Sequence, residues 1–393
     1  MGKKDFFCAN GTLKNIAEGL KERCNGHEKN LKVHLIYAFN GTGKTRLSHE
    51  FEKLVPQKTE RTENEIPILN YNPDFEDILN YNSDFEDIFY WEKESSHKLV
   101  VQNNSFLQFI INELGEEKEI VSYFQKITNK GINVNFHINE RDTKDWITFD
   151  FMTGGNDTER NIKISKGEES CFIWSIFFNY MQIAIKEKMA SDNGEKTTNK
   201  FDALKYIFID DPVSSLDQNH LIELAIELSK VIRECAAIGL NVIITTHNTL
   251  FYNILYNEIK EKKSYFLTRL ENGTNELIEK KGDANNALSY HLYLKDILVR
   301  AIESGKLKKY HFMLLRNLYE KTAMFLGYKS WGQILPQDDV SRYTRIMNLN
   351  SHSKLTDEEY RDLPEDDKVS VGVLVKHLIH NFKFFEEKNQ NER

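Results

Sequence analysis

The sequence predicts an α/β domain built around a phosphate-binding turn, followed by an all-α region. Three observations support this fold class. A β-branched and aromatic run at 32–39 and a helical run at 45–54 enclose a turn that contains two glycines. A second apolar run, 206–209, ends in two adjacent aspartates. From Asp283 onward the apolar residues recur at helical spacing.

Length and composition limit the classes of protein to consider. The 393 residues suffice for two or three domains of about 100–200 residues, and we expect domains at 1–280 and 281–393. The net charge of −8 argues against a protein that coats nucleic acid but permits a local basic pocket. No Cys-x-x-Cys pair or signal peptide is present, and the most apolar stretch, 171–185, is too short for a membrane span of about 20 residues. We therefore expect a cytoplasmic protein without a membrane partner, and a buried helix at 171–185.

The first turn has the residues of a phosphate loop. Its glycines let successive backbone N–H groups surround phosphate oxygens, and the following helix adds its partial positive charge. The lysine reaches the terminal phosphates and the threonine hydroxyl can ligate magnesium. Ala38 replaces the first glycine of the usual pattern, which raises a question about the start of the turn. The predicted nucleotide-binding residues here are Asn40, Gly41, Gly43, Lys44 and Thr45.

Two later strands supply the polar groups that hydrolysis requires. Asp210 is suited to hold magnesium together with Thr45, and Asp211 is placed to orient or deprotonate the attacking water. The run 242–246 ends in His247, which we interpret as a sensor of the terminal phosphate. A purely structural role for this histidine is the alternative.

The segment Ser165-Lys166-Gly167-Glu168 lies between the phosphate loop and the two aspartates in the sequence. This order is typical of ATP-binding-cassette (ABC) ATPases, in which such a segment at a helix N-terminus binds the phosphate held by the opposite protomer. We therefore predict a P-loop ABC-type ATPase completed in a homodimer or higher oligomer, with Ser165, Gly167 and Glu168 at the nucleotide. A helix cap made by Ser165 and Glu168 is compatible with this role. ABC ATPases also use a glutamine that lies between the phosphate loop and the segment corresponding to 165–168. Gln102 is our hypothesis for this glutamine.

A tandem repeat joins residues 70–79 to residues 80–89, which differ at two of ten positions. We interpret it as a slipped duplication that lengthens one loop, and we assign it no chemistry. An acidic contact surface near the nucleotide is the alternative.

The all-α region carries a second group of reactive side chains. Its stronger helical segments are 287–303, 308–326 and 369–387. Arg316 and Glu320 are four residues apart in the middle segment, beside apolar residues that include Met324, and His352 lies in a polar stretch. An Arg, a Glu and a His suffice for metal-free RNA cleavage, because they supply a cation, a base and an acid. A buried structural ion pair is the alternative for Arg316 and Glu320.

Two segments follow the ATPase and its run Asp210–Asp217: they are the run Arg316–Ala323 and the segment Asn350–Ser353. With these segments the chain resembles the PrrC-type bacterial anticodon nucleases over nearly its whole length. The resemblance implies an ATPase that controls a C-terminal nuclease with Arg316, Glu320 and His352 as catalytic residues. Such a nuclease cuts transfer RNA, typically tRNA-Lys, on the 5′ side of the wobble nucleotide. The cut leaves a 2′,3′-cyclic phosphate and a 5′-hydroxyl.

The same resemblance implies partners and regulators. ATP or GTP with Mg²⁺ acts at the ATPase, with dTTP as a regulator. A type I restriction-modification complex inhibits the enzyme until a phage disables that complex. Asp283 and Ser289 match the segment proposed to recognise the anticodon.

Two other classes of function stay open. One is a DNA-repair or chromosome-structure ATPase of the RecF or SMC kind, which is disfavoured because no long heptad segment separates the ATPase halves. The other is a defence sensor ATPase that acts through a separate effector.

Overall fold

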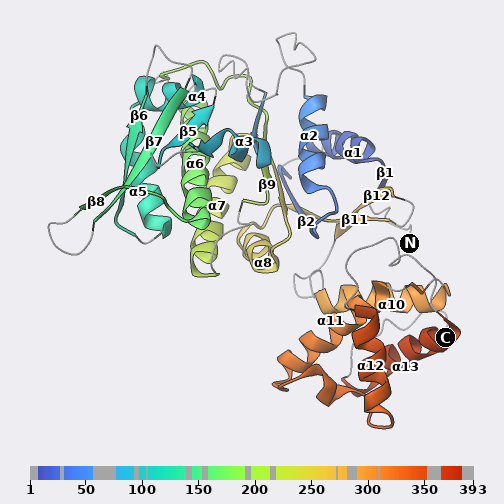
Figure 1. Ribbon diagram of the computed structural model, residues 1–393. Coiled ribbons are helices and arrows are strands. Elements are labelled where there is room, and N and C mark those ends of the chain that lie inside the picture. Colours follow the sequence, from blue (N-terminus) through green and yellow to red (C-terminus); the bar gives the residue numbers. More distant parts are fainter. Residues whose placement is uncertain are drawn as a thin grey trace. The chain divides into compact units, whose positions relative to one another are not determined.

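The chain divides into two compact units, Met1–Lys281 and Gly282–Arg393, both drawn in Figure 1. The computed structural model describes residues 8–26, 31–55, 77–92, 97–102, 105–128, 130–138, 144–152, 158–190, 196–212, 218–270, 273–280, 290–305, 307–308, 310–351 and 364–382.

The first unit is built on a seven-stranded sheet. In spatial order its strands are β1 (Cys8–Gly11), β12 (Asn275–Lys280), β11 (Lys263–Arg269), β2 (Val33–Ala38), β10 (Asn241–Thr246), β9 (Tyr206–Asp210) and β3 (Ile78–Tyr81). From β11 to β3 all neighbours are parallel, whereas β12 and β1 are antiparallel. The carboxyl ends of β2, β10 and β9 therefore meet at one edge, with β10 between the other two.

Helices cover both faces of this sheet. On one face α1 (Leu13–Asn25) and α2 (Lys44–Leu54) share a core with inward residues of the strands, and they lie together in Figure 1. On the other face α7 (Gln218–Ala237) and α8 (Thr249–Glu258) contact β10 and β2. Every residue of β2, β9 and β10 is buried. Burial on both faces explains why these strands read as continuous apolar runs and not as alternating ones.

A second sheet lies within the same unit. Its strands run in the order β4 (Phe89–Trp91), β5 (Leu99–Gln102), β7 (Lys144–Met152) and β6 (Ile132–His137), and β8 (Thr158–Ile162) pairs with β7. The helical segments beside it are α4 (Ser105–Gln108), a π-helical turn (Phe109–Glu113) and α5 (Glu117–Thr128).

The long helix α6 (Lys166–Ala190) connects the two sheets. Its Phe172 packs edge-on against Phe149 of the second sheet, and its Trp174 packs edge-on against Tyr81 of the main sheet. Because it has neighbours on several sides, α6 is apolar around most of its circumference. The predicted buried helix at 171–185 is confirmed. The helix continues to Ala190, and its buried Glu187 accepts hydrogen bonds from the backbone amides of Thr197 and Thr198.

The tandem repeat is not simply a longer loop. Its second copy forms the end of β3, the short helix α3 (Ser83–Asp87) and the start of β4. Tyr81 is fully buried and donates a hydrogen bond to Glu86, and Asn80 accepts one from Ser48 of α2. Ile78 and Leu79 of the first copy belong to β3, whereas 70–76 lie outside the described residues. The second copy is thus part of the folded sheet.

The described elements of the second unit are mainly helices. They are α10 (Tyr290–Glu303), α11 (Tyr310–Phe325), a 3₁₀ turn (Trp331–Ile334), α12 (Val340–Ser351) and α13 (Glu365–Asn381). Their shared core includes Leu298, Phe312, Tyr319, Met347 and Leu374. The helical segments expected from the sequence did not include α12, although Val340, Tyr343 and Met347 recur at helical spacing and pack on the core.

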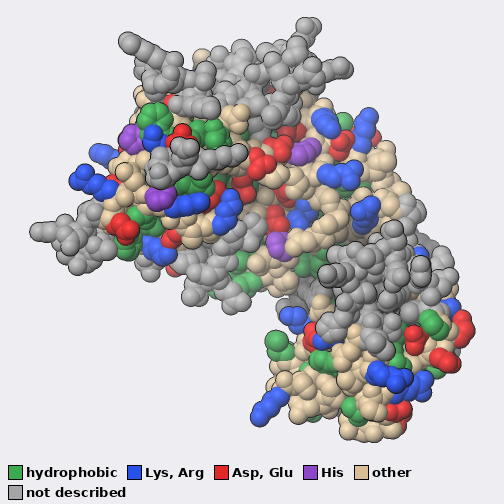
Figure 2. Space-filling model, in the orientation of Figure 1, with side chains coloured by type: hydrophobic (Ala, Val, Ile, Leu, Met, Phe, Trp, Pro, Cys, Tyr) green, Lys and Arg blue, Asp and Glu red, His purple; other side chains and the backbone are tan. Residues whose placement is uncertain are grey.

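The drawn surface of the described residues carries charged side chains of both signs (Figure 2). Figure 2 shows acidic and basic side chains interspersed over the drawn face of the described residues. Within those residues no helix combines the length and the apolar character needed to cross a bilayer. Cys24, Cys171 and Cys235 are buried free thiols.

Candidate functional site

The phosphate loop connects β2 to α2 at the edge where the parallel strands end. Gly41 and Gly43 adopt φ values of 80° and 97°, which side chains rarely tolerate. A Cβ atom on Gly43 would lie 2.9 Å from Cδ1 of Leu13. Ala38 is a buried residue of β2, so the position needs no glycine and the question raised by the sequence is resolved. Thr42 closes the turn, because its hydroxyl donates to the Phe39 carbonyl at 2.7 Å.

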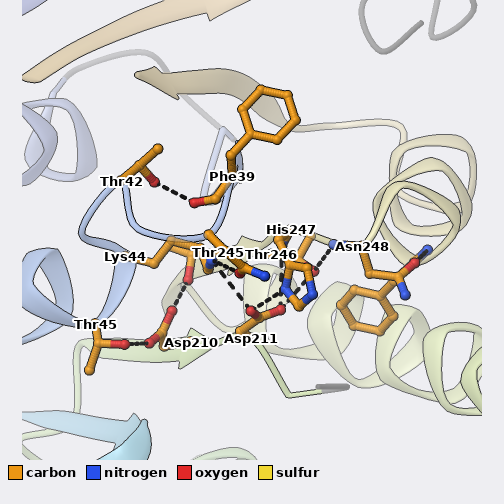
Figure 3. A network of polar contacts seen from close by, with 12 residues as sticks. Phe39, Thr42, Lys44, Thr45, Asp210, Asp211, Thr245, Thr246, His247 and Asn248 are labelled. Atoms are coloured by element: carbon orange, nitrogen blue, oxygen red, sulfur yellow. Dashed lines mark hydrogen bonds and ion pairs between the residues drawn. The ribbon is translucent and has the colours of Figure 1, made fainter. Parts of the chain in front are cut away.

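The two aspartates after β9 occupy different environments (Figure 3). Asp210 is 6% exposed, and its carboxylate accepts hydrogen bonds from Thr45 Oγ1 at 2.5 Å and from Thr245 Oγ1. Asp211 has a left-handed backbone with φ of 50°. Its carboxylate accepts from Thr246 Oγ1 at 3.2 Å and contacts Nδ1 of His247. Strand β10 therefore orients both carboxylates.

Lys44 links the loop to this pair. Its ammonium lies 3.4 Å from Asp211 Oδ2 (Figure 3). It also donates to Asn40 Oδ1 at 3.2 Å. The predicted residues of the phosphate loop, both aspartates and His247 are thus brought to one site. An ammonium, two carboxylates and an imidazole at the end of a phosphate loop are the groups that phosphoryl chemistry uses.

The pKa values of the two carboxyls move in opposite directions. Burial raises the pKa of Asp210, and the hydrogen bonds from Thr245 and Thr45 offset this only in part. Burial also acts to raise the pKa of Asp211, but the hydrogen bond and charge of His247, together with Lys44, outweigh it and leave that pKa below its ordinary value. Asp211 is therefore held as a carboxylate.

A cavity of about 530 Å³ adjoins the loop and the aspartates. Its wall includes four residues of the β11–β12 hairpin, and Arg269 and Asn275 are the two with the longer polar side chains. The side-chain amide of Asn275 donates through Nδ2 to the Thr42 carbonyl at 2.8 Å and so holds the phosphate loop in place. Sequence reasoning missed both residues, because the hairpin lies more than 200 positions from the loop and carries no local motif.

Ser165 and Glu168 form the helix cap at the start of α6. The Ser165 amide donates to Glu168 Oε2 at 2.6 Å, and the Glu168 amide donates to Ser165 Oγ at 3.3 Å. The cap interpretation is confirmed. Ser165 is exposed, and Gly167 lies in the first turn of α6. Gln102 ends β5 in the second sheet, with its side chain exposed.

The charged pair of the second unit lies on α11. Arg316 Nε donates to Glu320 Oε1 at 2.8 Å, and Arg316 Nη1 donates to Asn348 Oδ1 of α12 at 3.2 Å. Glu320 is 44% exposed and Met324 is 70% exposed. The ion pair of that alternative is present, but it is partly exposed and not buried. The core face of α11 carries Phe312, Leu315 and Tyr319 instead.

The third predicted catalytic residue, His352, lies outside the described residues, as do Asp283 and Ser289. Helix α12 ends at Ser351, directly before His352. Two other histidines have structural contacts. His311 is buried and accepts from the Lys308 amide through Nδ1 at 2.9 Å, and His377 contacts the Tyr319 hydroxyl at 3.2 Å.

The phosphate loop, the aspartate pair and the parallel sheet define a P-loop protein with a mixed α/β nucleotide-binding unit. No protein-family model matches the chain. A curated protein of Escherichia coli, an anticodon nuclease, is 43% identical over 377 residues, which are 92% of this chain and 91% of that protein. The chain belongs to the family of PrrC-type anticodon nucleases.

SMC head domains are among the solved structures with a detectable likeness. A head bound to the C-terminal winged-helix domain of ScpA is 11% identical with a TM-score of 0.36, and the match covers 65% of this chain and 92% of that one. The head from Thermotoga maritima is 10% identical with a TM-score of 0.31, and the match covers 64% and 91%.

Proposed function

We propose that this protein is a nucleotide-regulated anticodon nuclease that cleaves tRNA through Arg316, Glu320 and His352. The observation that carries this proposal is the Arg316–Glu320 pair on a half-exposed face of α11. The pair belongs to the second compact unit, whereas the phosphate loop belongs to the first. This division supports a role for the pair other than nucleotide hydrolysis. The family membership supports tRNA as the substrate.

The cutting step is a transesterification that uses the RNA's own 2′-hydroxyl. Glu320 removes the 2′-OH proton, the 2′-oxygen attacks the adjacent phosphorus, and His352 protonates the departing 5′-oxygen. Glu320 and His352 can exchange the base and acid roles. Arg316 stabilises the extra negative charge of the pentacoordinate phosphate. The products are a 2′,3′-cyclic phosphate and a 5′-hydroxyl. The family resemblance supports a cut 5′ of the wobble nucleotide of tRNA-Lys.

The first unit acts as the switch. The loop binds ATP or GTP, with dTTP as a regulator, and two such units close around nucleotide when Ser165 and Gly167 of one protomer reach the phosphate of the other. Thr45 Oγ1 and the Asp210 carboxylate are adjacent hard oxygen donors, which fit Mg²⁺. The ion would neutralise phosphate charge, and Asp211 would orient the attacking water.

The proposed setting is cytoplasmic anti-phage defence, with a type I restriction-modification complex as the inhibitor. This part rests on the resemblance of the sequence to the PrrC family.

Incubation of the purified protein with bulk tRNA tests the activity. We expect a single cut, a cyclic phosphate on the 5′ fragment, and no cut when the scissile nucleotide is 2′-deoxy. Arg316→Ala, Glu320→Gln and His352→Ala should each remove cleavage and leave nucleotide hydrolysis intact. A 3′-hydroxyl on the 5′ fragment would refute the mechanism. Absence of cleavage with every tRNA and nucleotide would favour an ATPase that acts on DNA or through a separate effector.

A further inference from the structure

Arg316 is contacted by three elements of the second unit. Glu320 accepts its Nε–H from within α11, and Asn348 accepts an Nη1–H from α12 at 3.2 Å. The Trp331 ring of the 3₁₀ turn lies under the guanidinium, with 5.4 Å from the ring centroid to Cζ. The side chain of Arg316 is 21% exposed and that of Glu320 is 44% exposed.

The pair with Glu320 is insufficient to fix the guanidinium. A partly exposed i,i+4 ion pair holds two flexible side chains only weakly, and arginine loses much rotamer freedom when it is fixed. The Trp331 ring face adds a cation–π contact with the guanidinium, which restricts where this group can lie. The Asn348 oxygen adds a directional acceptor from a second helix, which orients the guanidinium.

Asn348 also has an informative place in the chain. It precedes His352 by four positions in the sequence, and it belongs to the helix that ends at Ser351. The bond from Arg316 to Asn348 therefore fixes the last turn of α12 against the face of α11 that carries the charged pair. The stretch that contains His352 continues from this fixed turn.

We propose that Asn348 and Trp331 are positioning residues for RNA cleavage, which hold the Arg316 guanidinium for the scissile phosphate and fix α12 against α11. This inference rests on the proposed nuclease function. Neither residue is assigned contact with the substrate's reacting atoms. Their effect is exerted through Arg316.

Single-turnover cleavage of tRNA by the full chain tests the role of Asn348. Asn348→Ala should lower the maximal rate by about 10- to 100-fold with little change in the tRNA concentration at half-maximal rate, because misplacement of a catalytic group affects the reacting geometry. Asn348→Asp keeps an oxygen acceptor of the same shape and should restore most of the rate. Arg345→Ala, at an exposed position of the same helix, is the matched control and should cleave as the wild type does.

A double-mutant comparison separates positioning from simple stabilisation. In an Arg316→Lys background, which lacks Nη1, Asn348→Ala should have little further effect on the rate, since residues that act as a unit are not additive. Trp331→Phe should retain more activity than Trp331→Ala, because a ring remains for the arginine. Equal rate losses for Asn348→Ala in both backgrounds, or a failure of Asn348→Asp to restore activity, would overturn the positioning role.

The controls also separate this inference from the proposed function. If Arg316→Ala removes cleavage while Asn348→Ala cleaves at the wild-type rate, only the positioning role fails. If Arg316→Ala cleaves at the wild-type rate, the nuclease assignment itself fails.

Discussion

The two groups of polar side chains in this molecule are built in contrasting ways. Asp210 is almost completely buried and is held by hydroxyls from α2 and β10. Glu320 stands on a helix surface with nearly half of its side chain exposed. The first geometry is fixed by parallel strands whose ends must coincide, whereas the second depends on how separate helices pack. Changes at the exposed pair should therefore leave nucleotide hydrolysis working.

The largest expected effect is at the exposed pair. Glu320→Gln keeps the size of the side chain but removes the group that exchanges a proton, so tRNA cleavage should fall by about 10²- to 10⁴-fold. Nucleotide hydrolysis, measured as phosphate release, should stay near the wild-type rate. Glu303→Gln, an exposed position of α10, is the control. Loss of hydrolysis in Glu320→Gln would show that the two units are not independent.

The reciprocal change is Asp211→Asn. This substitution removes the carboxylate that would orient water and weakens the pairing with Lys44 and His247. Hydrolysis should slow by about 10²- to 10³-fold while nucleotide stays bound, giving a long-lived complex detectable by filter binding. Asp202→Asn, at an exposed surface position, is the matched control. Hydrolysis at the wild-type rate in Asp211→Asn would contradict the role given to this carboxylate.

The sequence anticipated the first site well, because each of its parts is a short run. Glycines after a strand, two aspartates after another and a histidine after a third lie at one edge once the strands are parallel. The hairpin residues Arg269 and Asn275 were not found, since only the order β12–β11–β2 brings them to the loop. Tertiary pairing over long separations leaves no local pattern.

The second site was harder to anticipate. Helical spacing showed that Arg316 and Glu320 are neighbours, but it misjudged their burial, because periodicity alone does not show how wide the covered face of a helix is. The contacts with Asn348 and Trp331 depend on α12 and the 3₁₀ turn. These contacts join separate elements of the chain, and such tertiary pairing leaves no local pattern in the sequence.

The stability of the first unit should depend on pH through a buried histidine, and this effect should be of intermediate size. His34 in β2 is buried, and burial, followed by the charges of Lys263, Arg23 and Lys32, lowers its pKa from 6.5 to about 3. Between these values the unfolded chain binds a proton that the folded chain does not. Stability is therefore complete above pH 6.5 and falls as the pH decreases, by about 2 kcal/mol at pH 5.

His34→Gln should remove most of this acid sensitivity, although the buried substitution has its own cost at pH 7. Hydrogen exchange of the β2 and β10 amides at pH 7 and pH 5 measures the effect in the first unit alone. His380→Gln, at an exposed position in the second unit, should not change it. An equal loss of protection in wild type and His34→Gln between the two pH values would exclude His34 as the cause.

The smallest expected effect is at Ser165, where a cap and a phosphate contact can be told apart. Ser165→Ala removes the hydroxyl bonded to the Glu168 amide and should cost about 1 kcal/mol of stability. Asparagine caps helices about as well as serine, so Ser165→Asn should restore the stability. If the exposed hydroxyl also binds phosphate across a dimer, Ser165→Asn should still fail to dimerise with nucleotide, because its larger amide replaces the hydroxyl at the point of contact. Sedimentation with and without nucleotide measures this, and normal dimerisation of Ser165→Asn would leave Ser165 with the cap as its only role.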